Sequence, residues 1–358
     1  MPDNINNHYL LFNDPLRMYN AMLDDIEQAK HYIYIETYKY GNDPIGMKFR
    51  DELTKKAKQG VQVKLLIDSW GAYVGSSYFS EMINYGGEVI FFKKIRLSFD
   101  FFTKNHRRNH RKLLVIDDNI SYIGSANIAI HSMNWRESVL RFVGDIAIPF
   151  RQVFNEHCKL YNKYIFDKIA STKSIKHRGF EILLDVPSSL IQATRKKYLD
   201  LIRSAKKSII IETPYFLPGS YMRRAIVEAA EREVEVKIIM PYRSDVQMVD
   251  ILRDKYLGDL HHQHIHLLFY KPKNLHAKIF IVDHEKFIVG SSNFDYRSFR
   301  FQHEINLFGK SKRILTKLNE HIDETIQDCE QFNYEFWLRR PRIQKFFERV
   351  LVPFRHFF

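Results

Sequence analysis

The chain has 358 residues, of which 45% are hydrophobic and 14% are aromatic; this excludes a disordered protein and leaves room for about two domains. The formal net charge of +13 favours an anionic partner, such as nucleic acid, an acidic membrane surface or a phosphate-bearing substrate. The two cysteines, Cys158 and Cys329, form no CxxC pair, so we expect a reducing compartment, no disulfide and no zinc–thiolate site.

The first 15 residues lack a basic region followed by an apolar run, and we expect no secretory signal peptide. No stretch approaches the roughly 18 consecutive apolar residues that a membrane-spanning helix needs. We therefore expect a protein that is soluble or lies on a membrane surface.

The first half of the chain alternates between helical and strand patterns. Apolar residues at helical spacing predict amphipathic helices, and short apolar runs bounded by turn residues predict strands. The expected order is helix 14–30, strand 32–38, helix 44–59, strand 61–68, helix 80–85 and strand 88–92.

The second half repeats this order, with helix 198–207, strand 208–213, helix 221–233, strand 234–240 and strand 265–270. Two pairs of segments echo each other in sequence: YIETY with IETPY, and VQVKLLI with VEVKIIM. These echoes indicate an internal duplication. Alternating strands and helices predict an α/β fold with covered sheets.

The same signature closes both halves: NHRKLLVIDDNISYIGSAN at residues 109–127 and LHAKIFIVDHEKFIVGSSN at residues 275–293. Each copy reads as two strands joined by a turn. His110 and Lys112 are two residues apart and share a strand face, as do Ser125 and Asn127. Asp117 falls in the turn. It is an odd number of residues from His110 and so does not share that face, which favours a structural role. The second copy gives the same arrangement with His276, Lys278, Asp283, Ser291 and Asn293.

If the two halves face each other, one pocket contains two imidazoles, two ammonium groups, two amides and two hydroxyls. The lysines, asparagines and serines can bind the oxygens of a phosphodiester and stabilise charge in the transition state. One neutral histidine can attack phosphorus while the other, protonated, donates to the leaving oxygen. This chemistry needs no metal, and we expect no cofactor.

A catalytic histidine usually needs a carboxylate at its second ring nitrogen. Glu137 lies 27 residues after His110, and Glu304 lies 28 residues after His276. This matched separation predicts that both glutamates orient histidines, but it leaves open which glutamate serves which histidine. Glu36 and Glu212 end equivalent strands and are expected either to line the site or to be buried in pairs.

Three further segments carry unusual composition. The insert at residues 93–109 mixes basic and aromatic residues. This composition fits either a solvated loop or a lip of the site that contacts lipid head groups or phosphate. Residues 170–178 read as a polar linker between the halves. Residues 334–358 interleave aromatic and basic side chains, which favours an element at a membrane surface over a helix docked on the protein itself. Four histidines between residues 261 and 266 favour a polar loop over a metal site.

With these residues in hand, the chain resembles the phospholipase D superfamily, which carries a duplicated HxKxxxxD motif followed by GSxN. Within it, RRNHRKLLVID, the stretch at residues 135–144 and IETPYFLP are similar to bacterial cardiolipin synthases. GSAN in the first copy and the expected lack of a spanning helix depart from the usual pattern of that branch.

The resemblance implies two phospholipase D-type α/β/α half-domains, at residues 1–168 and 169–329, related by pseudo-two-fold symmetry with the active site at their interface. Residues 330–358 would form a membrane-associating segment. The implied catalytic set is His110, Lys112, Asp117, His276, Lys278 and Asp283, with both aspartates structural and His110 favoured as nucleophile.

The implied activity joins two phosphatidylglycerol molecules and releases glycerol through a phosphohistidine. A phospholipase D hydrolase that yields phosphatidic acid, and a superfamily nuclease, remain alternatives. Anionic phospholipid at a bacterial membrane surface, reached from the cytoplasmic side, is the expected partner, and nucleic acid is not expected.

Overall fold

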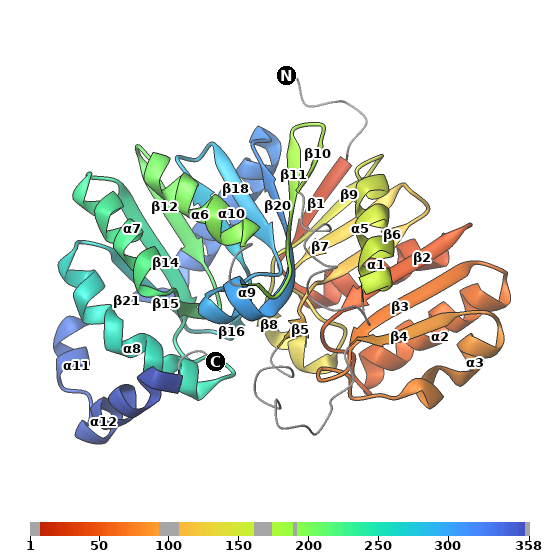
Figure 1. Ribbon diagram of the computed structural model, residues 1–358, viewed down its shortest axis with the longest axis horizontal. Helices are drawn as coiled ribbons and strands as arrows, with labels where there is room; N and C mark the ends of the chain where they lie inside the picture. Colours follow the sequence, from red (N-terminus) through yellow and green to blue (C-terminus); the bar gives the residue numbers. More distant parts are fainter. Residues whose placement is uncertain (1–7, 93–106, 161–173, 189–191, 355–358) are drawn as a thin grey trace.

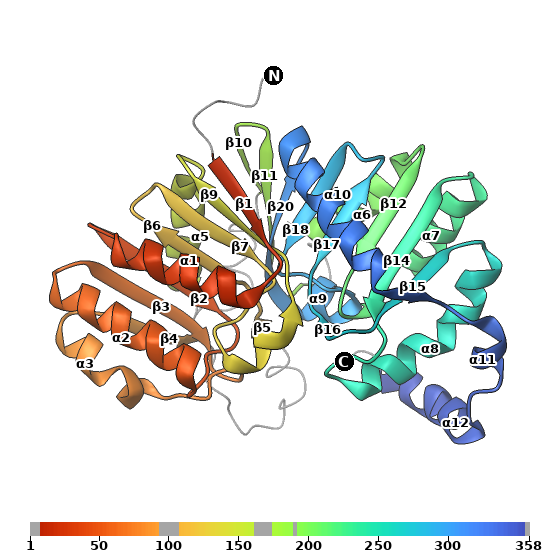
Figure 2. The ribbon, with the colours of Figure 1, turned by 180° about the vertical axis from the view of Figure 1, so that it is seen from behind.

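The computed structural model describes residues 8–92, 107–160, 174–188 and 192–354. It has two mixed sheets side by side, with helices packed over their faces (Figures 1 and 2). Most of the insert at residues 93–109 and the first part of the expected linker lie outside the described residues. No helix within the described ranges is long and apolar enough to cross a bilayer.

The first sheet has the strand order β1-β9-β7-β6-β2-β3-β4. The elements of this half are β1 (His8–Phe12), α1 (Pro15–Glu27), β2 (Tyr32–Thr37), α2 (Pro44–Lys58), β3 (Gln62–Asp68), α3 (Ser80–Asn84), β4 (Glu88–Phe92), β5 (Arg108–Asn109), β6 (Leu113–Ile116), β7 (Ile120–Gly124), β8 (Trp135–Arg136), β9 (Val139–Val143) and α5 (Ala147–Leu160). Helices α1 and α2 each begin with an aspartate cap followed by proline, because Asp14 and Asp43 accept hydrogen bonds from first-turn amides.

The second sheet has the order β10-β11-β20-β18-β17-β12-β14-β15-β21. Its half contains β10 (Ile175–His177), β11 (Phe180–Asp185), α6 (Ala193–Ser204), β12 (Ser208–Glu212), β13 (Phe216–Leu217), α7 (Ser220–Glu231), β14 (Glu235–Pro241), α8 (Gln247–His262), β15 (His266–Tyr270), β16 (Asn274–Leu275), β17 (Ile279–Val282), β18 (Lys286–Gly290), β19 (Phe294–Asp295), α9 (Tyr296–Phe301), β20 (Gln302–Gly309), α10 (Lys312–Gln327) and β21 (Cys329–Gln331). Two short helices, α11 (Tyr334–Leu338) and α12 (Arg342–Leu351), follow.

The alternation of helices and strands confirms the predicted α/β class. Several boundaries differ from the prediction. The expected linker at residues 170–178 ends in β10, which pairs with β11, because the turn at Arg178 and Gly179 has positive φ and closes a hairpin. Helix α6 begins at Ala193, earlier than predicted. His261 and His262 end α8 instead of lying in a loop.

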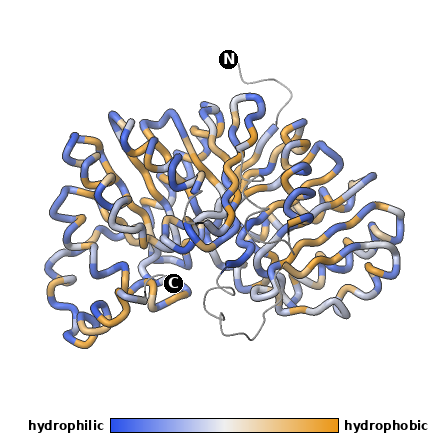
Figure 3. The backbone as a smooth tube through the Cα atoms, viewed as in Figure 1, coloured by the Kyte–Doolittle hydropathy of each residue, from blue (hydrophilic) through white to orange (hydrophobic). Residues whose placement is uncertain are grey.

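The hydrophobic core has three layers. The outer face of the first sheet packs on α1, α2 and α3, and the outer face of the second packs on α6, α7 and α8. Between them, one cluster joins the inner faces of both sheets with α5 and α10. Figure 3 shows the hydrophobic colour running along the strands of both sheets. The two halves therefore share a continuous core, and the segments at their junction are held rigidly.

Candidate active site

Short parallel strands join the two halves crosswise at their junction. Strand β5 of the first half pairs with β20 of the second, and β16 of the second half pairs with β8 of the first. The residue that follows each pairing is a signature histidine. The His110 N–H donates to the His303 carbonyl at 3.0 Å, and the His276 N–H donates to the Arg136 carbonyl at 2.8 Å. Each histidine is thus anchored on the backbone of the opposite half.

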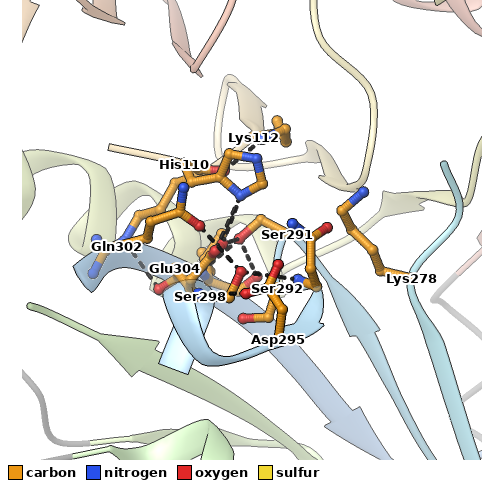
Figure 4. Close-up of polar contacts among 12 residues, drawn as sticks. His110, Lys112, Lys278, Ser291, Ser292, Asp295, Ser298, Gln302 and Glu304 are labelled. Atoms are coloured by element: carbon orange, nitrogen blue, oxygen red, sulfur yellow. Dashed lines mark hydrogen bonds and ion pairs between the residues drawn. The ribbon is translucent and has the colours of Figure 1, made fainter. Parts of the chain in front are cut away.

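The two predicted glutamates meet the histidines in the same crosswise manner. The His110 Nδ1 lies 3.0 Å from Glu304 Oε1 (Figure 4). The His276 Nδ1 lies 2.9 Å from Glu137 Oε2. Both glutamates are fully buried. Because each carboxylate occupies Nδ1, the Nε2 atom of each ring is left for chemistry. The pairing that the sequence left open is therefore between the halves and not within each one.

The signature serines contact these glutamates and are not among the residues that line the pocket between the histidines. That they bind phosphate stays a prediction. The Ser125 hydroxyl donates to Glu137 Oε2 at 2.5 Å, and the Ser291 hydroxyl donates to Glu304. Each serine oxygen also accepts a backbone N–H, from Ser138 and Ile305 respectively. These contacts use the hydroxyls to fix the glutamates, because a buried carboxylate needs several hydrogen-bond donors.

Each signature lysine binds the backbone of the histidine two residues before it. Lys112 Nζ donates to the His110 carbonyl at 2.6 Å, and Lys278 Nζ donates to the His276 carbonyl at 2.7 Å. Both side chains are almost fully buried. Lys112 Nζ also lies 5.5 Å from the ring centre of Tyr38. Burying an ammonium group is costly, and a nearby anion would offset that cost.

The signature aspartates lie in the turns, outside the pocket. Asp117 accepts backbone N–H groups from Lys30, His31 and Tyr32 at 2.6–2.8 Å. Asp283 accepts the equivalent three from residues 206–208. Both have positive φ, as tight hairpin turns require. They fasten the signature hairpin to the start of the neighbouring strand, as the parity argument expected.

A pocket of about 170 Å³ opens between the halves and is lined by both signature histidines and both signature asparagines. Asn127 Oδ1 accepts from the Lys39 N–H at 3.1 Å, and the buried Asn293 Oδ1 has no hydrogen-bond partner among the described residues. The remaining lining residues are Tyr38, Lys39, Trp135, Tyr215, Asp245, Val246, Val249, Asp295, Arg297 and Gln302.

The sequence prediction missed most of these lining residues. Tyr38 and Tyr215 had a usable signal, because both follow the echoed strand ends at Glu36 and Glu212. The ring of Tyr38 lies 5.3 Å from that of His110, and the ring of Trp135 lies 4.8 Å from that of His276. Arg297 comes from α9 and Asp245 from the loop before α8, and neither position carried a signal in the sequence analysis. We call this space the interface pocket.

Burial makes both histidines weak bases. It holds the pKa of His110 well below the ordinary 6.5, and Lys112 and Lys278 lower it further. Burial also lowers the pKa of His276 to about 4, against the opposing charge of Glu137. In the empty pocket both rings are therefore neutral near pH 7.

The two glutamates differ from each other. Burial raises the pKa of Glu304 to about 7, although Lys112 opposes it. Burial acts in the same direction on Glu137, but His276 and Lys278 outweigh it and lower the pKa of that carboxyl. His276 thus faces an ionised carboxylate, whereas His110 faces one that protonates near neutrality. Burial also lowers the pKa of Lys278 to about 8.

Two features singled out in the sequence lie elsewhere. Glu36 and Glu212 do not line the interface pocket but are buried beside His157 and His321. Within the described ranges, no group of three or more histidine, cysteine or carboxylate side chains is arranged to hold a metal ion.

Comparison with known proteins gives consistent matches. A family described as "Cardiolipin synthase, PLD-like domain" matches residues 22–157 and 198–326. The major cardiolipin synthase ClsA of Bacillus subtilis is 32% identical over 94% of this chain and 73% of its own length. The cardiolipin synthase of Alkalihalophilus pseudofirmus is 30% identical, over 96% of this chain and 71% of its own.

Among solved structures, phosphatidylserine synthase of Haemophilus influenzae superposes with a TM-score of 0.79 at 14% identity, covering 99% of this chain and 94% of its own. This likeness confirms the phospholipase D-type fold, and the two matched segments confirm its duplication. The chain therefore belongs to the cardiolipin synthase family of phospholipase D-like proteins.

Proposed function

We propose that the protein is a phosphatidyltransferase of cardiolipin synthase type, which joins two phosphatidylglycerol molecules and releases glycerol through a phosphohistidine. The observation that carries this proposal is the pair of neutral, crosswise-oriented histidines in one pocket, each with a buried signature lysine on its backbone carbonyl. The names of the curated relatives support the choice of cardiolipin as product.

In the first step, the Nε2 of His110 attacks phosphorus while the bond from phosphorus to the glycerol oxygen breaks. His276, protonated in the complex, gives its proton to that oxygen, and glycerol leaves. An arriving phosphodiester favours this protonation because its negative charge raises the pKa of the nearby imidazole. Lys112, Lys278 and the two asparagine amides stabilise the charge that develops on the phosphoryl oxygens.

In the second step, neutral His276 removes the proton from a hydroxyl of a second phosphatidylglycerol. That oxygen attacks phosphorus, the bond to His110 breaks, and cardiolipin forms. Both histidines return to their starting states, so atoms and charges balance over the cycle. If water takes the place of the alcohol, the product is phosphatidic acid.

The unequal glutamates support this division of roles. Ionised Glu137 stabilises a protonated His276, as an acid requires. His110 is held neutral by burial and by two lysines, which favours it as the nucleophile. In this proposal each signature aspartate fastens the signature hairpin of its own half and takes no part in the proton transfers.

We further propose that residues 1–168 and 169–329 are the two half-domains and that residues 330–358 attach the enzyme to the membrane from the cytoplasmic side. The support is an apolar face on α11 and α12 that remains exposed: Phe336, Ile343, Phe346 and Phe347 are 72%, 62%, 58% and 44% exposed. Basic residues flank this face, which suits an anionic lipid surface.

The same two helices also dock on the protein. Trp337 Nε1 donates to the Asp254 carbonyl at 2.7 Å, and Gln344 donates to the Asp254 carboxylate at 3.0 Å. This anchoring holds α11 and α12 against α8, at the lower edge of the molecule in the view of Figure 1. Docking and membrane contact are thus compatible.

The test is product analysis. Purified protein is mixed with phosphatidylglycerol vesicles, and the lipids and free glycerol are measured by mass spectrometry, with His110→Gln and His276→Gln as controls. The proposal predicts cardiolipin and glycerol in equal amounts from wild type and neither from the variants. Phosphatidic acid alone would identify a hydrolase, and no lipid turnover with cleavage of added DNA would identify a nuclease.

A further inference from the structure

Two glutamates outside the interface pocket lie at the ends of equivalent strands of the two halves. Glu36 is the second-last residue of β2 and contacts His157 of α5, with 2.6 Å between Oε1 and Nδ1. Glu212 ends β12 and contacts His321 of α10, with 2.8 Å between Oε2 and Nε2. All four side chains are at most 2% exposed and lie within the shared apolar layer between the sheets.

Hydrogen bonds extend the first pair toward His110. The His157 Nε2 lies 3.1 Å from the His303 Nδ1. His303 accepts the backbone N–H of His110 through its carbonyl, and its neighbour Glu304 holds the imidazole of His110. The first network therefore consists of Glu36, His157 and His303 and ends on the two consecutive residues that fix His110.

The second pair reaches the other histidine by an equivalent path. The Thr325 hydroxyl of α10 donates to the His321 carbonyl at 2.7 Å and also lies 3.3 Å from Glu212 Oε1. Arg136 donates through Nε to the Thr325 hydroxyl at 2.7 Å and through Nη2 to the His321 carbonyl at 2.9 Å. The Arg136 carbonyl accepts the His276 N–H, and its neighbour Glu137 holds the imidazole of His276. The second network consists of Glu212, His321, Thr325 and Arg136.

Each network begins in one half, crosses to a strand of the other half and returns to the histidine of its own half. We propose that the two networks are separate positioning devices, the first for His110 and the second for His276. The expected effect of these networks on kcat rests on the proposed function. Their hydrogen-bond geometry does not depend on it.

Packing alone gives a poor account of these residues. Buried ion pairs add little net stability over well-packed apolar side chains, since removing two charges from water is costly. Here seven polar side chains, each at most 9% exposed, are retained in an otherwise apolar layer. Their hydrogen bonds instead fix directions, which matters because small displacements of a catalytic group strongly reduce rate.

The networks also differ in one position. The residue before the orienting glutamate is His303 in the first and Arg136 in the second. An arginine side chain only donates hydrogen bonds, whereas a ring nitrogen of an imidazole can donate or accept. Among other charged groups, Arg111 faces Glu36, and Glu324 contacts Arg136. The residues around the two orienting glutamates therefore differ between the His110 side and the His276 side. This difference agrees with different roles for the two histidines.

The experiment compares Glu36→Gln with Glu212→Gln in protein labelled with 15N-histidine, at pH 8. Ring N–H signals of His110 and His276 are assigned by their loss in His110→Gln and His276→Gln. We expect Glu36→Gln to shift the His110 signal and leave that of His276, and Glu212→Gln to do the reverse. In assays of lipid turnover each variant should lose kcat by about 10- to 100-fold, the usual effect of removing an outer partner of a functional histidine, with KM unchanged.

The matched control is Glu320→Gln, which changes an exposed glutamate next to His321 and should shift neither signal. Should Glu36→Gln not fold, His157→Asn tests the same network. A shift of both signals by either variant, or of neither, overturns the proposal, since general loosening is not confined to one histidine. The spectra need no turnover, so a failure of the proposed lipid chemistry would leave this result readable.

Discussion

Glu137 and Glu304 occupy equivalent places but should respond differently to the same substitution. A hydrogen bond to a charged group contributes about 1.5–3 kcal/mol, and replacing the carboxylate by an amide leaves only a neutral acceptor. If that contribution is made in the transition state, kcat falls by about 10- to 160-fold. Glu137 is ionised, so we expect Glu137→Gln to suffer this loss at pH 6 and at pH 8.

Glu304→Gln should lower kcat in this way only at the higher pH. Burial raises its pKa to about 7, so at pH 6 it is mostly a neutral acid that glutamine resembles closely. We therefore expect Glu304→Gln to keep most of the wild-type kcat at pH 6 and to lose as much as Glu137→Gln at pH 8. The assay is initial-rate kinetics on phosphatidylglycerol vesicles, with each variant divided by wild type at the same pH.

An equal loss for both variants at pH 6 would refute this reasoning, because it would mean that both carboxylates are ionised there. A rise in KM with unchanged kcat would also contradict it, since that pattern indicates lost substrate binding and not lost orientation. Ser291→Ala offers a further check, because this hydroxyl donates to Glu304 and its loss should raise the carboxyl pKa further.

Three other predictions concern stability and membrane contact. Asp283→Asn should lower the free energy of unfolding in urea by about 1.5–3 kcal/mol, because its carboxylate accepts three backbone N–H groups, while kcat stays near wild type; a normal unfolding curve would contradict the structural role. Burial lowers the pKa of His276 to about 4, so the folded protein binds fewer protons than the unfolded chain between pH 6.5 and 4, and stability falls as the pH falls. The urea unfolding free energy of wild type should therefore drop by up to about 3 kcal/mol more than that of His276→Gln over this range; equal drops would refute it. Changing Ile343 and Phe346 together to Asn should weaken binding to phosphatidylglycerol vesicles at least about 30-fold, at about 1–2 kcal/mol per side chain, whereas Leu16→Asn on α1, also an exposed apolar residue, should leave sedimentation with vesicles unchanged.

Much of the fold could be predicted because both halves of the sequence contain the same pattern of elements. Long elements with clear periodicity, such as α2 and β3, were predicted to within a residue or two. The repeated signature placed both hairpins, and parity set Asp117 and Asp283 apart from the histidines. His110 and Lys112, however, precede β6 instead of lying in it, because the first pairing of that segment is with β20 of the other half.

The contacts between the halves could not be predicted. Strands β5, β8 and β16 are two residues long and carry no periodic pattern; they exist because distant segments meet at the junction. The same crossing decides that Glu304 serves His110. The serines, by contrast, meet the glutamates within each half, because β7 pairs with β9 and β18 pairs with β20.

The most direct test of the two-histidine mechanism uses a substrate whose leaving group needs no acid. Phosphatidyl-p-nitrophenol allows His110 to be phosphorylated without help from His276, whereas release of the adduct still needs His276 as base. The His276→Gln variant should therefore give a burst of one p-nitrophenolate per enzyme and a phosphatidyl adduct on the peptide that contains residue 110, detected by mass spectrometry. The His110→Gln variant should give neither. A burst and adduct in His110→Gln instead would reverse the assignment of the two histidines, and full turnover by either variant would contradict the mechanism.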